Sequence, residues 1–105
     1  MVVTQSVTVF GFGSAFNGKN TASDIDLLIV HQGTDLASCQ FAIACKRRLA
    51  ESIERAHITM LSNAEEAHFE FIKTAEAVCL GSIREDRFGG DLTALGASLL
   101  APGAA

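Results

Sequence analysis

The chain has 105 residues, of which 49% are hydrophobic and 19% are charged. This length and composition suit one compact domain and exclude a disordered chain. The formal net charge of −4 argues against a protein that binds extended nucleic acid, because such binding depends on neutralising phosphates with Lys and Arg.

Two strands are predicted in the first third of the chain. Residues 6–10 (SVTVF) alternate β-branched and other residues and end at Gly11, which is typical of a short strand. Residues 11–23 are rich in Gly, Ser, Asn and Thr and predict a loop. Residues 24–31 begin with two aspartates and continue as an apolar run with turn residues on both sides, which predicts a central strand buried on both faces.

The middle of the chain predicts a helix, a strand and a second helix. Over residues 35–55, apolar side chains recur at steps of three and four and form one face: Leu36, Cys39, Ala42, Cys45, Leu49 and Ile53. Residues 56–61 (AHITML) predict a third strand. Ser62 and Glu65 then have the spacing of a capping box, which predicts a helix running to about Ala75.

The last quarter of the chain gives weaker signals. Residues 78–80 predict an edge strand, and three leucines, Leu92, Leu95 and Leu99, could line a short helix that folds back on the core or forms a docking or dimer surface. The order of elements predicts an α/β fold with a small mixed β-sheet of three to four strands, flanked by helices. We expect a core over residues 1–80 and a tail over residues 81–105 with a frayed end.

Cysteine usage and the N-terminus indicate the compartment. The three cysteines, Cys39, Cys45 and Cys79, show no Cys-x-x-Cys spacing, which favours reduced thiols over a disulfide framework or a zinc site. The first ten residues lack a signal-peptide pattern, and no apolar run is long enough to span a bilayer. We therefore expect a cytoplasmic protein without membrane association.

The glycine-rich loop was compared with two phosphate-binding patterns that it does not satisfy. The dinucleotide fingerprint G-x-G-x-x-G fails because Phe16 stands where its third glycine belongs. The P-loop pattern is matched by Gly13, Gly18 and Lys19, but Asn20 replaces its hydroxyl residue. A P-loop must also open a long helix, whereas here a strand follows within a few residues.

A third pattern fits both the residues and their context. Gly13-Ser14 is followed after nine residues by Asp24-Ile25-Asp26 and then by a strand. In this the chain resembles the minimal nucleotidyltransferases of the DNA polymerase β-type superfamily, whose signature is Gly-Ser, a spacer of about this length, and Asp-x-Asp on a strand. The resemblance covers roughly residues 7–80, including the strand ITMLS and the acidic start of the helix after it. It implies a nucleotidyltransferase-like fold and the transfer of a nucleoside monophosphate.

The two aspartates suit that chemistry. Residues i and i+2 of a strand point to the same face, so Asp24 and Asp26 can together hold Mg²⁺ (or Mn²⁺), which prefers oxygen ligands. Such metals bridge the triphosphate of an NTP, ATP above all, and activate an acceptor hydroxyl for attack on the α-phosphorus. Gly13 allows close approach to phosphate, Ser14 offers donors, and Lys19 stands where the resembled family often places a basic residue. Alternatively, Asp24 caps a turn while Asp26 pairs with a helical arginine.

His57 marks a departure from the resembled family. Active members carry a third acid on the following strand, and alignment on AHITMLS puts His57 at that place. Imidazole can ligate metals, but it is softer than the ligands Mg²⁺ prefers and brings no negative charge. His57 is therefore either a third metal ligand or a structural histidine at a strand end. We expect His31 and His68 to be structural or surface residues.

Two functional hypotheses follow. The first is a nucleotidyltransferase that moves an NMP, most readily AMP, to a hydroxyl of a protein or small molecule. The second is a nucleotidyltransferase-like module with little activity, which acts through a protein partner. The resemblance implies that the acceptor is presented by a separate helical protein, as in toxin–antitoxin modules where the minimal enzyme modifies its partner. A homo-oligomer is the other partnership that we consider.

Overall fold

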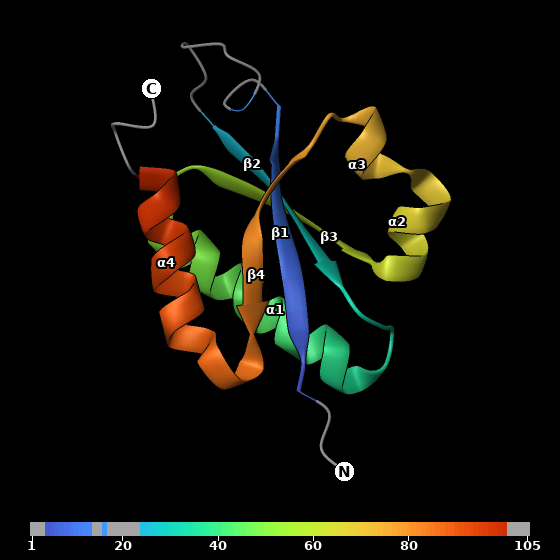
Figure 1. Ribbon diagram of the computed structural model, residues 1–105, viewed down its shortest axis with the longest axis horizontal. Coiled ribbons are helices and arrows are strands. Elements are labelled where there is room, and N and C mark those ends of the chain that lie inside the picture. Colours follow the sequence, from blue (N-terminus) through green and yellow to red (C-terminus); the bar gives the residue numbers. More distant parts are fainter. Residues whose placement is uncertain (1–3, 14–15, 17–23, 101–105) are drawn as a thin grey trace.

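The computed structural model describes residues 4–13, 16 and 24–100, with side chains described up to Ala97. It contains a four-stranded sheet in the order β3-β2-β1-β4 (Figure 1). The strands are β1 (Ser6–Phe12), β2 (Ile25–His31), β3 (Ala56–Ser62) and β4 (Val78–Arg84). Because β1 is antiparallel to both β2 and β4 while β2 and β3 are parallel, the sheet is mixed. The expected α/β class with a small mixed sheet is confirmed.

Two helices cover one face of the sheet. Helix α1 (Leu36–Ser52) connects the parallel strands β2 and β3, and α4 (Phe88–Leu100) follows β4 and the short 3₁₀ turn η1 (Glu85–Arg87). The two helices meet through the rings of Phe41 and Phe88, whose centroids are 5.9 Å apart. The core lies between these helices and the sheet, and its buried members include Val7, Val9, Leu27, Ile29, Phe41, Ala42, Cys45, Leu49, Ile53, Ile83 and Leu95.

Helix α1 is shorter than the expected range of 35–55. Asp35 is its N-cap, and the Asp35 carboxylate accepts the Ser38 N–H at 3.3 Å. The helix ends at Ser52, and three residues later the backbone of Arg55 takes a positive φ of 61° before β3 begins. A residue in the left-handed conformation cannot continue an α-helix, so the helix ends before residue 55. Ile53, the last residue of the apolar pattern, is the C-cap and lies just beyond the helix.

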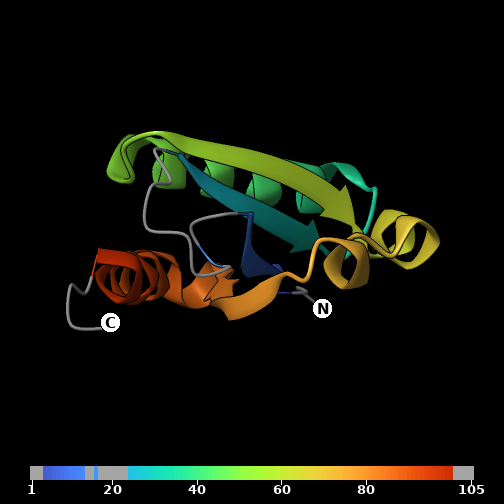
Figure 2. The same cartoon turned by 90° about the horizontal axis from the view of Figure 1, so that it is seen from above.

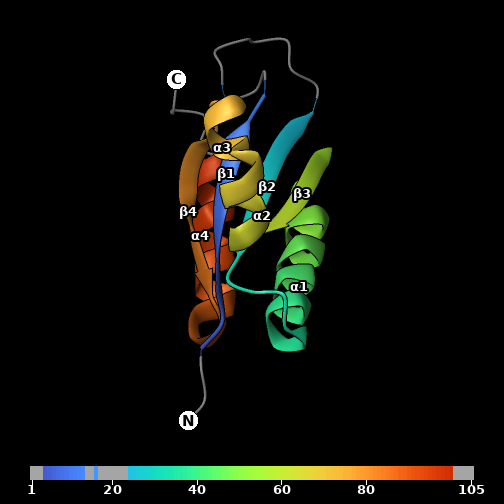
Figure 3. The same cartoon turned by 90° about the vertical axis from the view of Figure 1, so that its right-hand side faces the viewer.

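The second face of the sheet is covered in part by α2 (Asn63–Phe69) and α3 (Phe71–Thr74), which lie across the sheet from α4 (Figures 1 and 3). The capping box that begins α2 is confirmed, since Ser62 and Glu65 exchange hydrogen bonds of 2.9 and 3.1 Å. The Ser62 backbone and side-chain donors lower the pKa of the Glu65 carboxyl. The expectation of one helix to Ala75 is wrong, because Glu70 adopts the left-handed conformation (φ 50°) and divides it.

Strand β2 is the most buried strand of the sheet. Leu27 and Ile29 face α1 and α4, while Leu28 and Val30 alternate onto the face of α2 and α3. All four are at most 7% exposed. The prediction of a central strand buried on both faces is confirmed.

The C-terminal part of the chain belongs to the same core. Strand β4 runs to Arg84, past the boundary expected at residue 80, and both Ile83 and Leu95 are buried. The Arg84 N–H also donates to the Asp91 carboxylate at 3.0 Å, which ties β4 to α4. The expected leucine helix therefore folds back on the sheet (Figure 2). The expected frayed end at 101–105 and the Leu99 side chain lie outside the described part.

None of the described helices is both long and apolar enough to cross a membrane.

Candidate functional site

The two aspartates of the Asp-x-Asp motif stand at the beginning of β2. The Ile25 N–H between them donates to the Arg55 carbonyl at 3.0 Å, which fixes this end of the strand beside the loop before β3. Asp26 lies between Phe12 of β1 and His57 of β3 in the register of the sheet. By strand alternation Asp26 faces away from the core residues Leu27 and Ile29. Its carboxylate is therefore on the face of the sheet opposite α1 and α4.

His57 lies beside both aspartates. It is the register partner of Asp26, and its Nε2 is 3.6 Å from Oδ2 of Asp24. The side chains of His57 and Asp24 are 67% and 50% exposed, respectively, so solvent and a ligand can reach both. The expectation that His57 could face the motif agrees with this arrangement. The structure thus brings the three predicted metal-site residues to one end of the sheet.

The predicted alternative, in which Asp26 pairs with a helical arginine, does not occur. Within residues 4–13, 16 and 24–97, the side-chain ion pairs are His57 with Asp24 and Arg84 with Asp86. Asp24 is therefore paired with His57, and Asp26 is in no ion pair within these residues. Two carboxylates near one imidazole form a site that is rich in negative charge and suited to a cation with oxygen ligands.

Gly13 borders the same site from the end of β1. Its φ is +79°, in the left-handed region, and a Cβ added there would lie 2.5 Å from Oδ2 of Asp26. The Asp26 carboxylate thus occupies space that any other residue at position 13 would need. Only glycine combines this backbone conformation with this close approach at little cost. The predicted phosphate-approach residue and the predicted metal ligand are in direct contact.

Phe16 fixes the beginning of the loop after Gly13. Its N–H donates to the Gly13 carbonyl at 3.0 Å, closing a turn, and its ring packs against the core. The ring lies so close to Gly11 that a Cβ at that position would collide with it. The sequence analysis missed this contact. Its only signal is a glycine near the end of a β-branched strand, which does not indicate which ring will cover it.

Two other predicted phosphate-binding residues, Ser14 and Lys19, lie outside the described residues.

The remaining histidines are placed as expected. His31 is 7% exposed, and its Nδ1 donates to the Gly33 carbonyl at 2.8 Å, which stabilises the turn before α1. His68 is exposed on α2, with its ring edge-to-face against Phe69. Both lie apart from the aspartates and fill structural or surface positions.

The His57 and Asp24 side chains of the site are exposed to solvent. Among the described residues, no three His, Cys, Asp or Glu side chains are grouped closely enough to hold a metal by themselves. Bound phosphate oxygens or water would therefore have to complete the coordination of a cation held there.

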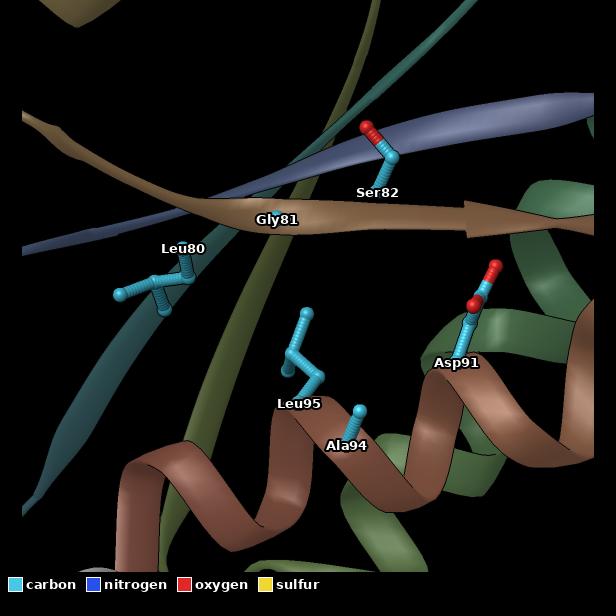
Figure 4. Close-up of a pocket in the computed structure, with 6 residues that line it drawn as sticks. All are labelled: Leu80, Gly81, Ser82, Asp91, Ala94 and Leu95. Atoms are coloured by element: carbon cyan, nitrogen blue, oxygen red, sulfur yellow. The ribbon is translucent and has the colours of Figure 1, made fainter.

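Two pockets lie elsewhere, beside α4. One, of about 130 Å³, is lined by Leu80, Gly81, Ser82, Asp91, Ala94 and Leu95 between β4 and α4 (Figure 4). The other, of about 330 Å³, lies between α1 and α4 next to Arg48 and Gly96. In the first pocket the Asp91 carboxylate already accepts the Arg84 N–H. Neither contains a residue of the Asp-x-Asp motif.

Comparison with family models, with curated proteins and with solved structures finds no match to this chain. The candidate site is therefore interpreted from its own residues and geometry.

Proposed function

We propose that this chain is a metal-dependent nucleotidyltransferase that transfers an NMP, most readily AMP, from an NTP to a hydroxyl on a protein or small molecule. The observation that supports it most is the contact between Gly13 and the Asp26 carboxylate, with Asp24 and His57 beside them. The glycine of the predicted phosphate-binding pair thereby adjoins the residues suited to a metal. In the resembled family, the Gly-Ser pair and the metal-binding Asp-x-Asp pair of this motif bind the same triphosphate.

In the proposed reaction, the acceptor oxygen forms a bond to the α-phosphorus, and the bond from that phosphorus to the bridging oxygen of the β-phosphate breaks. Pyrophosphate leaves with the electron pair, and the hydroxyl proton passes to solvent or to a carboxylate of the site. The metal supplies charge neutralisation on the triphosphate and makes the hydroxyl more acidic. Asp24 and Asp26 would hold that metal, and Gly13 at the end of β1 lets the Asp26 carboxylate approach the backbone closely.

The acceptor and its partner are also proposals. The described residues around the aspartates belong to one sheet with its helices. We propose that a helical protein partner, or a second copy of the chain, presents the hydroxyl.

Binding of ATP with Mg²⁺, followed by calorimetry, tests the proposal. Wild type should bind the nucleotide only with the metal present, and the double variant Asp24→Asn/Asp26→Asn should lose this binding. The matched control is Asp86→Asn, which removes an exposed carboxylate in η1 and should bind as wild type does. Equal binding by wild type and the double variant, or binding by neither, would contradict the proposal.

One observation favours a second function, a nucleotide-binding module that acts through a protein partner with little turnover. His57 stands where active members of the resembled family carry a third acid. The described residues also contain no group of three side chains that could hold a metal by themselves. Pyrophosphate release from ATP distinguishes the two. If wild type binds ATP without releasing pyrophosphate while His57→Asp releases it, the chain is a binding module.

A further inference from the structure

We propose that His57 makes this site selective for Mn²⁺ over Mg²⁺. This inference rests on the proposed function, because it concerns the metal of the same site. It goes further by naming the residue of this chain that decides which ion is used.

The first argument is geometric. Two ligand atoms that share one ion at about 2.1 Å lie about 3.0 to 3.6 Å apart for bond angles of about 90 to 120°. The distance from His57 Nε2 to Asp24 Oδ2 is 3.6 Å, at the upper end of this range. One ion could therefore contact both atoms with little movement of either side chain. The two side chains are 67% and 50% exposed, which leaves the ion an open approach.

The second argument concerns the backbone. His57 is held opposite Asp26 by the parallel pairing of β2 and β3, with Leu27 paired to Ile58 and Ile29 to Met60 on the core side. This pairing places one imidazole and one carboxylate on adjacent strands at the same level of the sheet. The position of His57 beside the motif is therefore determined by the core packing and not by a surface rotamer alone.

The third argument is chemical. Mg²⁺ strongly prefers oxygen ligands, whereas first-row transition ions accept imidazole nitrogen as well. Mn²⁺ is the transition ion that also suits carboxylate and water ligands, so it can accept Oδ2 of Asp24 and Nε2 of His57, with phosphate or water completing its coordination. An aspartate at position 57 would add a hard, charged ligand and remove the only nitrogen ligand, which shifts the preference towards Mg²⁺.

The experiment measures metal binding without turnover. Mn²⁺ and Mg²⁺ are titrated separately into wild type and His57→Asp at one fixed pH, with a non-hydrolysable ATP analogue present. Free Mn²⁺ is counted by electron paramagnetic resonance, and Mg²⁺ binding is followed by calorimetry. We expect His57→Asp to lower the ratio of Mn²⁺ to Mg²⁺ affinity by about tenfold or more, the size of effect that changes around a metal ligand produce.

The matched control is His68→Asp, the same substitution at an exposed histidine of α2. It should leave the affinity ratio unchanged. An unchanged ratio in His57→Asp, or an equal change in both variants, would overturn the role of His57. If the analogue still binds with metal and still requires Asp24 and Asp26, the proposed function survives that result. If wild type binds neither the analogue nor either ion, both proposals fail.

Discussion

Gly13→Ala tests whether the close contact between Gly13 and Asp26 builds the site. The substitution acts in two separable ways. Alanine at φ +79° costs about 1–2 kcal/mol of stability, because its Cβ crowds the backbone in the left-handed region. The new Cβ would also lie 2.5 Å from Oδ2 of Asp26, whereas ordinary contacts begin near 3.4 Å.

The carboxylate must therefore move by about 1 Å, since it is the free end of the side chain and the nearest backbone is not in the way. A displacement of this size at a reacting centre can lower the rate about a hundredfold. We expect Gly13→Ala to lower the free energy of unfolding by about 1–2 kcal/mol, which lowers the urea midpoint. We also expect it to lose most of the proposed metal-dependent ATP binding. Urea unfolding followed by circular dichroism and calorimetry with ATP and Mg²⁺ or Mn²⁺ measure the two effects.

Gly96→Ala is the matched control. Gly96 lies within α4, and a Cβ added there would have no neighbour within 4 Å. Removing a glycine from a helix interior should raise the stability by about 0.5–1 kcal/mol and leave ATP binding unchanged. The two Gly→Ala changes should thus shift stability in opposite directions. Wild-type stability together with wild-type ATP binding in Gly13→Ala would refute the reasoning.

Two further predictions concern the core and the thiols. Leu95→Ala should lower the unfolding free energy by about 2–5 kcal/mol in urea, because Leu95 is 4% exposed against the sheet; a change near zero would mean that the segment after residue 80 is a tail. Ellman's reagent should modify exposed Cys79 quickly in the native protein, whereas Cys45, buried so that its thiol pKa rises to about 12, should react only after urea is added. Equal rates at the two thiols in native protein would contradict the packing of α1.

Local signals in the sequence were enough to predict much of the fold. The capping box at Ser62 and Glu65 depends on residues three apart, and it forms as expected. The unbroken apolar run of β2 identifies a strand covered on both faces, because alternation would otherwise leave every second residue in water. Both features are properties of short segments, so neither needs knowledge of the tertiary structure.

The errors occur where the tertiary path overrides a local pattern. After β3 the chain must pass the second face of the sheet to begin β4 beside β1, and the turn it needs is made at Glu70, within an apparently continuous helical pattern. The sequence predicts an edge strand over residues 78–80 only, yet β4 continues through Gly81, whose φ is +148°, close to a register shift beside Val9. Glycine at such an irregularity marks a bend in a strand rather than its end.

The candidate site likewise combines features that the local sequence predicts with contacts that depend on the tertiary structure. The alignment on AHITMLS placed His57 near the motif, and the pairing of β2 with β3 sets it opposite Asp26. The contact between Gly13 and the Asp26 carboxylate could not be predicted, because it depends on how closely the end of β1 approaches β2. The packing of Phe16 over Gly11 likewise depends on a loop conformation that the sequence does not specify.

The register of β2 and β3 decides whether the His57 side chain lies beside the aspartates or faces the core. A slip of one residue would bring Ala56 or Ile58 opposite Asp26 and turn His57 towards the core. That slip would also expose Ile58 and Met60, which now pack against the core cluster beside Leu27 and Ile29. The hydrophobic packing on one face of β3 therefore fixes the histidine on the other. Consequently, substitutions that disturb Ile58 should weaken the proposed metal selectivity, even though this side chain lies on the far side of the sheet from the aspartates.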